Sequence, residues 1–253
     1  MSLDLTPLDK YGPAAVEFFW GTRVDAAMKQ QEGGKADQGE RAGVTGGHNM
    51  DGFMMLLVEL AKANGMPDAE IFTAASAVTL PGYFRPTKRW DLLIVSGSQL
   101  VAAIELKSQV GPSFGNNFNN RTEEAIGSAH DFWTAYREGA FGDGPRPFLG
   151  WLILVEDCEK SRAPGTRLDA PHFDVFPEFI SASYLERYEI LCRKLMLENL
   201  YTNAALVTSV RDPDPPGAFR QLSATTCLRG FASAFTGHVA AVVSSQGRGD
   251  GEP

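Results

Sequence analysis

Two short apolar runs joined by a polar turn constrain the fold of this chain more than any other feature. The runs cover residues 92–95 and 100–104, and Ser96, Gly97, Ser98 and Gln99 lie between them. Two such runs around a glycine-containing turn predict a β-hairpin. Both faces of this hairpin are apolar, so it is expected inside a sheet that is covered on both sides. The fold class is therefore predicted to be α/β.

Charged side chains stand at the open end of this hairpin. Asp91 precedes the first run, and Glu105 and Lys107 lie two residues apart on the second, so the latter two share one face. With a turn at 96–99, Asp91 lies opposite residue 104 or 105, where two carboxylates repel each other. A hard divalent cation such as Mg²⁺ would compensate this repulsion. So short a pattern also fits a surface strand end in which Lys107 pairs with one of the acids.

Strand alternation assigns the apolar residues of the hairpin to its two faces. The face of Glu105 and Lys107 is expected to carry Leu93, Val95, Val101 and Ala103. The other face is expected to carry Leu92, Ile94, Ala102, Ile104 and Leu106.

Longer strings around the hairpin resemble restriction endonucleases of the XhoI type. These strings are PTKRWDLLIV at 86–95, IELKSQVGPSFGNNFNNR at 104–121 and AIGSAHDFW at 125–133, and a weaker resemblance extends over most of the chain. The D…ExK motif alone is typical of the whole PD-(D/E)xK nuclease superfamily, which also holds repair and recombination enzymes. The usual Pro-Asp pair appears here as Trp90-Asp91, with Pro86 five residues before the acid. Proline is not a ligand, so the departure leaves the expected chemistry unchanged.

The resemblance implies a restriction-endonuclease-like core, with a mixed central sheet flanked by helices, and a set of site residues. Asp91, Glu105 and the backbone carbonyl of Leu106 are expected to hold Mg²⁺ against the scissile phosphate. Lys107 is expected to keep its proton beside two acids and to orient the attacking water. Nucleases of this class often add a glutamate from the first core helix, which makes Glu59 a catalytic candidate. Glu59 equally fits a solvent-facing helix position.

The resemblance also implies a substrate and partners. The implied function is that of a type II site-specific deoxyribonuclease, which cuts double-stranded DNA at the palindrome CTCGAG and leaves 5′ overhangs. A palindromic site is matched most simply by a two-fold homodimer with one active site for each strand. A cognate DNA methyltransferase is expected as a genetic partner.

Polar and basic residues on either side of the trio are candidates for DNA contacts. Lys88 and Arg89 are expected to position phosphates, although an exposed basic pair is common on any surface. Asparagine and arginine also read adenine and guanine edges in the major groove. The candidates in the segment after the second run, interpreted as an irregular loop, are Asn116, Asn117, Asn119, Asn120 and Arg121. The alternative is a polar turn with asparagines in the left-handed conformation.

The remaining elements follow from periodicity and from helix boundary signals. Helices are predicted at 13–31, 53–64, 121–138 and 184–199, and strands at 147–155 and 203–209. The first helix should bury Val16, Phe19, Trp20, Val24, Ala27 and Met28, and the third Ile126, Ala129, Phe132, Trp133 and Tyr136. Asp51 is expected to cap the second helix, which Gly65 ends. Residues 1–244 are interpreted as a single nuclease domain with a glycine-rich loop at 33–52, and residues 245–253 as a disordered tail.

Composition limits the class of protein. The formal net charge of −8 disfavours non-specific DNA binding and leaves room for a local basic cleft. No secretory leader is expected at residues 1–12, which lack a basic region followed by an apolar stretch, and no membrane span is expected, because no apolar run reaches 18 residues. Cys158, Cys192 and Cys227 match no zinc motif and no disulfide framework, as expected for a cytoplasmic protein. Two alternatives remain open at this point, a structure-specific repair or recombination nuclease of the same fold and a non-catalytic DNA-binding protein.

Overall fold

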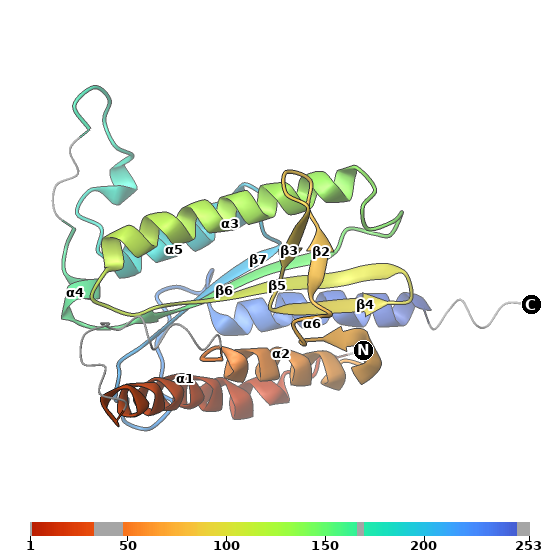
Figure 1. Cartoon of the computed structure of the whole chain (residues 1–253), viewed down its shortest axis with the longest axis horizontal. Helices are drawn as coiled ribbons and strands as arrows, with labels where there is room; N and C mark the ends of the chain where they lie inside the picture. The colour runs from red at the N-terminus through yellow and green to blue at the C-terminus, as the bar shows by residue number, and fades with distance from the viewer. Residues whose placement is uncertain (1, 33–47, 166–169, 247–253) are drawn as a thin grey trace, which may run out of the picture.

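A five-stranded mixed sheet forms the centre of the molecule in the computed structural model, which describes residues 2–32, 48–165 and 170–246 (Figure 1). The strand order is β1-β4-β5-β6-β7, with bounds β1 (Ile71–Phe72), β4 (Leu92–Ser96), β5 (Gln99–Gln109), β6 (Phe148–Glu156) and β7 (Asn203–Ser209). Strands β1, β4 and β5 pair antiparallel, whereas β5, β6 and β7 run parallel. The predicted α/β class and its mixed central sheet are confirmed.

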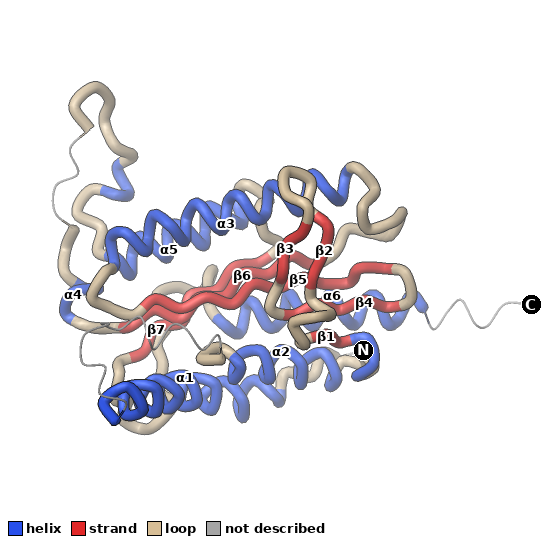
Figure 2. The backbone as a smooth tube through the Cα atoms, viewed as in Figure 1, coloured by secondary structure: helices blue, strands red, loops and turns tan. Residues whose placement is uncertain are grey.

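Helices cover both faces of this sheet, as the long apolar strands require (Figures 1 and 2). Helices α1 (Thr6–Glu32), α2 (Asp51–Ala63) and α6 (Leu228–Gln246) share one core with Leu92, Ile94 and Ile104. Helices α3 (Phe114–Arg137) and α5 (Tyr184–Leu197) share the other core with Leu93, Ala103 and Trp151. Short elements complete the described chain: α4 (Glu159–Arg162) and the 3₁₀ turns η2 (Asp68–Glu70) and η3 (Pro177–Phe179).

The hairpin of β4 and β5 forms as predicted, with one irregularity. Leu92 pairs with Ile104 and Ile94 with Ala102, but Val95 pairs with Leu100, so that Val101 is an extra residue in β5. Such a β-bulge shifts the alternation by one position. Val101 therefore lies in the core of α1, α2 and α6, and its predicted placement on the face of Glu105 is wrong.

Two predictions about the first helices also need correction. Val24 and Met28 are 50% and 57% exposed, because the buried stripe of α1 ends at Trp20. Asp51 is the first residue of α2 and not its cap; Met50 holds the capping position without a side-chain hydrogen bond. Gly65 follows the end of α2 with a φ of +94°, as the predicted termination requires. Residues 33–47 of the predicted glycine-rich loop lie outside the described residues.

Helix α3 begins seven residues earlier than predicted. Residues 114–120, interpreted from the sequence as an irregular loop, form its first two turns. The rings of Phe114 and Phe118 pack against Tyr184 and Tyr188 of α5, and this burial outweighs the poor helix propensity of the asparagines between them. Ile126, predicted to face inward, is 44% exposed.

The C-terminal part of the chain contains one helix that the sequence interpretation missed. Helix α6 buries Phe231, Phe235 and Val239 against the sheet and extends through Gln246, two residues into the predicted tail. Residues 247–253 lie outside the described residues. The predictions for β6, α5 and β7 are confirmed within one or two residues at each end. In α5, Ser183 and Glu186 form a reciprocal capping box.

A separate two-stranded sheet lies beside α3. It consists of β2 (Thr79–Pro81) and β3 (Thr87–Arg89), which pair antiparallel around a tip at residues 82–86. The chain passes directly from β3 through Trp90 and Asp91 into β4, so this hairpin is tied to the central sheet at the predicted site.

Candidate active site

The structure brings the predicted trio together at the open end of the β4–β5 hairpin. The Asp91 N–H donates to the Ile104 carbonyl (3.1 Å), and the Leu106 N–H donates to Asp91 Oδ2 (2.7 Å). Lys107 Nζ donates to Glu105 Oε1. Continuing the Leu92–Ile104 pair by one residue sets Asp91 opposite Glu105, one of the two registers predicted from the turn length.

A second lysine reaches the same carboxylate. Lys88, on β3, donates to Glu105 Oε2 (2.7 Å), and its ammonium lies 4.5 Å from the centre of the Trp90 ring. Its side chain is only 12% exposed, whereas the neighbouring Arg89 is exposed. Lys88 and Arg89 are therefore not an equivalent surface pair. Nothing in the sequence indicates the Lys88–Glu105 contact, because β3 belongs to a different sheet from β5.

The two acids differ in their electrostatic surroundings. Burial, and after it the charge of Glu105, raises the pKa of Asp91. Burial also raises the pKa of Glu105, but Lys107 and Lys88 outweigh this effect and hold that pKa below its usual value. Two carboxylates and two ammonium groups therefore balance one another in a largely buried cluster.

Asp131 of α3 fixes the hairpin that carries Lys88. Its carboxylate accepts the N–H groups of Tyr83 (2.8 Å) and Phe84 (2.7 Å), and Arg85 Nε donates to its other oxygen (2.8 Å). A Cβ atom on Gly82 would lie 2.6 Å from this carboxylate and 2.6 Å from the Arg85 carbonyl. The tip of the hairpin is thus held tightly against α3, and through β3 this contact positions Lys88.

The donor atoms at this site suit a hard divalent cation. Asp91 and Glu105 supply carboxylate oxygens, which Mg²⁺ prefers, and Mg²⁺ usually keeps several waters beside one or two protein carboxylates. No group of three or more His, Cys, Asp or Glu side chains with metal-binding geometry occurs among the described residues.

The candidate DNA contacts of the sequence interpretation lie on α3 rather than in a loop. Asn116, Asn119 and Asn120 are exposed, and Asn117 is half-buried. Arg121 forms an ion pair with Glu124 (2.5 Å), and its side chain is 25% exposed.

Glu59 is not brought to the trio. It lies on α2, which packs against the sheet face opposite to the one that carries Leu93 and Ala103. There its carboxylate pairs with Lys62 at 3.2 Å.

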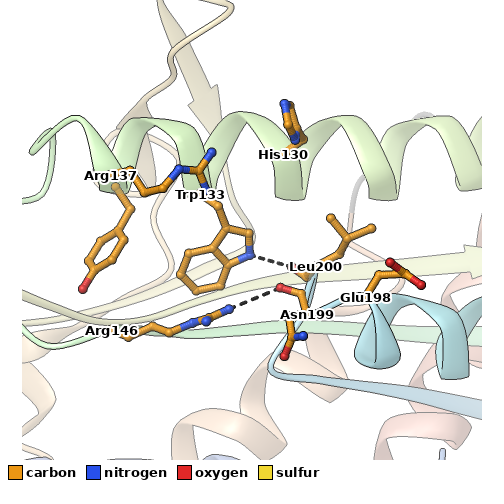
Figure 3. A pocket seen from close by; sticks show the side chains of 8 residues that line it. His130, Trp133, Arg137, Arg146, Glu198, Asn199 and Leu200 are labelled. Carbon is orange, nitrogen blue, oxygen red and sulfur yellow. Dashed lines mark hydrogen bonds between the residues drawn. The ribbon is translucent and has the colours of Figure 1, made fainter.

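A hollow of about 310 Å³ lies elsewhere, between α3 and the turn after α5 (Figure 3). Trp133 Nε1 donates to the Leu200 carbonyl (2.8 Å), and Arg146 lies over the Trp133 ring while donating to the Asn199 carbonyl (3.2 Å). No member of the trio lines this hollow. Its polar groups tie α3 to the start of β7, which is a structural role.

Comparison with known proteins decides which family carries this site. A family model described as restriction endonuclease XhoI matches residues 29–221, which include the trio and Lys88. The chain belongs to the XhoI restriction endonuclease family. No solved structure matches the chain.

Curated relatives agree with this membership of the XhoI family. The type II restriction enzyme XhoI of Xanthomonas vasicola is 56% identical over 78% of this chain and 79% of its own length. AbrI of Azospirillum brasilense is 59% identical over 68% of this chain and 77% of its own length. BstVI of Geobacillus stearothermophilus is 46% identical over 86% of this chain and 100% of its own length.

Membership of the XhoI family confirms the predicted class of enzyme. The chain is a type II restriction endonuclease, which hydrolyses double-stranded DNA at specific sites. Type II restriction endonucleases generally use divalent metal ions. None of the helices among the described residues has the length and apolar character needed to cross a membrane.

Proposed function

We propose that the chain cuts the palindrome CTCGAG in a Mg²⁺-dependent reaction that leaves 5′ overhangs. One observation supports the metal-dependent chemistry. The carboxylates of Asp91 and Glu105 lie together at the end of the β4–β5 hairpin, and both are surrounded by buried or half-buried groups. The choice of CTCGAG is supported by the resemblance of the chain to the XhoI family, to which it belongs.

In this proposal each residue of the trio has one role. Asp91, Glu105 and the Leu106 carbonyl would hold Mg²⁺, which when bound would supply charge stabilisation at the scissile phosphate and a water of lowered pKa. Lys107, fixed beside Glu105, orients the attacking water and stabilises negative charge on the phosphate oxygens. Burial and the charge of Glu105 raise the pKa of Asp91, and a cation between the two carboxylates would offset their mutual repulsion.

The proposed DNA surface combines α3 and the β2–β3 hairpin. Arg89 is exposed on β3, where its guanidinium group is available to a DNA phosphate. The exposed Asn116, Asn119 and Asn120 lie on the first turns of α3, and together with Asn117 and Arg121 they are the candidates for reading bases. A helix presents such side chains to a major groove as readily as the loop interpreted from the sequence.

The proposed partners are a second copy of the chain and a cognate DNA methyltransferase, and the proposed compartment is the cytoplasm. A two-fold homodimer places one active site on each strand of a palindrome, so the molar mass in solution should be twice the 27.4 kDa of one chain. Light scattering after size exclusion measures it. A cognate methyltransferase protects the host DNA. The cytoplasm, where thiols remain reduced, suits the free Cys158, Cys192 and Cys227.

A plasmid digest tests the activity directly. Matched plasmids with and without CTCGAG are incubated with the protein and MgCl₂, and the ends of the products are sequenced. The proposal predicts discrete bands only from the plasmid that contains the site, and no product from Asp91→Ala. Cleavage of both plasmids into heterogeneous products would favour a structure-specific repair nuclease, and absence of any cleavage by the wild-type protein would favour a non-catalytic DNA-binding protein.

A further inference from the structure

The carboxylates of the candidate metal site are already engaged by protein donors. Glu105 Oε2 accepts from Lys88 at 2.7 Å, and Glu105 Oε1 accepts from Lys107. Asp91 Oδ2 accepts the Leu106 N–H at 2.7 Å. Three of the four carboxylate oxygens thus have a donor, and a cation that approaches Glu105 meets an ammonium group at each of its oxygens.

Lys88 is the lysine that is free to leave. Lys107 is two residues from Glu105 on the same central strand, so its ammonium stays near that carboxylate. Lys88 comes from the separate two-stranded sheet of β2 and β3. Its flexible four-carbon stem allows the ammonium to turn away from Glu105 without a change in the strand.

An ammonium that leaves Glu105 needs another anion, because its side chain is only 12% exposed. The phosphate backbone of DNA provides one. The same hairpin presents the exposed Arg89 and, at its tip, Arg85 with 43% of its side chain exposed. A phosphate attracted by these guanidinium groups approaches the element that carries Lys88.

We propose that Lys88 couples DNA binding to metal binding by exchanging the Glu105 carboxylate for a DNA phosphate. Without DNA, Lys88 neutralises Glu105 and keeps its affinity for a dication low. With DNA, Lys88 pairs with a phosphate and leaves Glu105 to the metal. Lys88 is in this sense a positioning residue, and the inference rests on the proposed role of Asp91 and Glu105 as metal ligands.

Charge counting supports this exchange. Asp91 and Glu105 are balanced by Lys88 and Lys107, so a dication added alone leaves an excess of positive charge in a poorly solvated cluster. A phosphate that enters with the metal offsets this excess. Because binding free energies are linked, DNA must then raise metal affinity by the same factor as metal raises DNA affinity.

Isothermal titration calorimetry tests this coupling. Ca²⁺, which also binds to carboxylate oxygens, is titrated into the whole protein, once without DNA and once with a duplex that contains CTCGAG. For the wild type, the duplex should tighten Ca²⁺ binding about tenfold, within the usual range of such couplings. Lys88→Met should tighten Ca²⁺ binding to the free protein about tenfold and reduce the effect of DNA to about twofold or less. Lys88→Arg, which keeps the cation, should retain part of the coupling.

Arg229→Met is the matched control, because it removes a cation from an exposed ion pair with Asp9. It should leave both Ca²⁺ affinities unchanged. If Lys88→Met without DNA binds Ca²⁺ no more tightly than the wild type, the coupling through Lys88 is wrong, but the metal site at Asp91 and Glu105 is not affected. If the wild type binds no Ca²⁺ with or without DNA, the metal site itself is wrong.

Should Lys88→Met fail to fold, which its circular dichroism spectrum reports, the wild-type protein still tests the proposal. Its affinity for the duplex, measured by fluorescence anisotropy, should rise with Ca²⁺ by the same factor as its Ca²⁺ affinity rises with the duplex. A duplex affinity that is independent of Ca²⁺ contradicts the exchange.

Discussion

Asp91 and Glu105 are both acids on adjacent strands, yet folding shifts their pKa values in opposite directions. The difference comes from the lysines. Both oxygens of Glu105 accept from an ammonium group, whereas Asp91 Oδ2 accepts from a backbone N–H. The site therefore holds one acid whose ionised form is stabilised by two ammonium groups and one whose ionised form is destabilised by burial and by the charge of Glu105.

Asp91→Asn should stabilise the metal-free protein at pH 7 while abolishing cleavage. The asparagine oxygen keeps the hydrogen bond from Leu106 and removes a buried charge. Because folding raises the pKa of Asp91, its contribution to stability is complete below the unfolded value of 3.8 and is lost as the pH rises through the folded value. We expect the free energy of unfolding in urea at pH 7 to rise by about 1 kcal/mol.

The exposed acid Asp9 provides the control for this substitution, since Asp9→Asn should change the free energy of unfolding by less than about 0.5 kcal/mol. The gain from Asp91→Asn should disappear below pH 3.8, where both proteins are neutral at this position. A loss of stability at pH 7 would mean that attraction to Lys107 and Lys88 exceeds the cost of burying the charge.

At the scale of elements, helix α3 organises the site without contributing to the trio. Asp131 holds the tip of the β2–β3 hairpin. Trp133, two residues further along α3 and therefore on a different side of the helix, holds the turn before β7 (Figure 3). The first turns of α3 carry the asparagines proposed for DNA recognition. One helix thus sets the spacing between β3, β7 and the candidate DNA surface.

Asp131→Asn should loosen the β2–β3 hairpin. Burial raises the pKa of Asp131, but Arg85 and the N–H groups of Phe84 and Tyr83 outweigh this effect and lower it. The resulting stabilisation is present above the unfolded value of 3.8 and is lost as the pH falls through the folded value. Since Arg85 is partly exposed, we expect a loss of about 1 kcal/mol at pH 7 in urea unfolding.

Asp143→Asn, at an exposed position after α3, is the matched control and should have no measurable effect. The difference between Asp131→Asn and the wild type should shrink as the pH is lowered below about 4. A difference that is constant between pH 3 and pH 7 would show that the charge of Asp131 is irrelevant to the hairpin.

Trp133→Phe should weaken the attachment of α3 to the turn before β7. The phenylalanine ring keeps most of the apolar contact but loses the Nε1–H donor to the Leu200 carbonyl and weakens the contact with Arg146. A loss of about 1–2 kcal/mol in the free energy of unfolding is expected. Trp20→Phe removes a similar hydrogen bond, to Ser209, and serves as a comparison on the other side of the sheet. Unchanged stability of Trp133→Phe would argue against the structural role of the hollow.

For the whole molecule, the net charge of −8 differs from the local charge around the candidate active site. The charges of the trio and Lys88 sum to zero, and on the neighbouring hairpin the exposed Arg89 adds positive charge, whereas Arg85 is paired with Asp131. An acidic protein therefore presents a locally basic element to DNA. Specific recognition is compatible with this arrangement, and non-specific attraction is kept small.

Magnesium should stabilise the whole fold through the trio. A ligand that binds only the native state adds about 2.7 kcal/mol at a concentration 100 times its dissociation constant. The melting temperature, followed by circular dichroism, should rise steadily with the logarithm of the MgCl₂ concentration. Glu105→Gln should remove this rise, whereas Glu59→Gln should retain it, because Glu59 lies across the sheet. An equal response in the wild type and Glu105→Gln would assign the effect to another site.

Local sequence patterns were enough to predict the α/β class, the β4–β5 hairpin, the trio at its end and the family, because each depends on residues that are close along the chain. The bulge at Val101 and the helical start of α3 depend on packing against distant elements, such as Tyr184 and Tyr188 of α5. The same holds for the second lysine on Glu105. Only the tertiary structure brings β3 over β5, since a contact between two separate sheets leaves no periodic signal in the sequence.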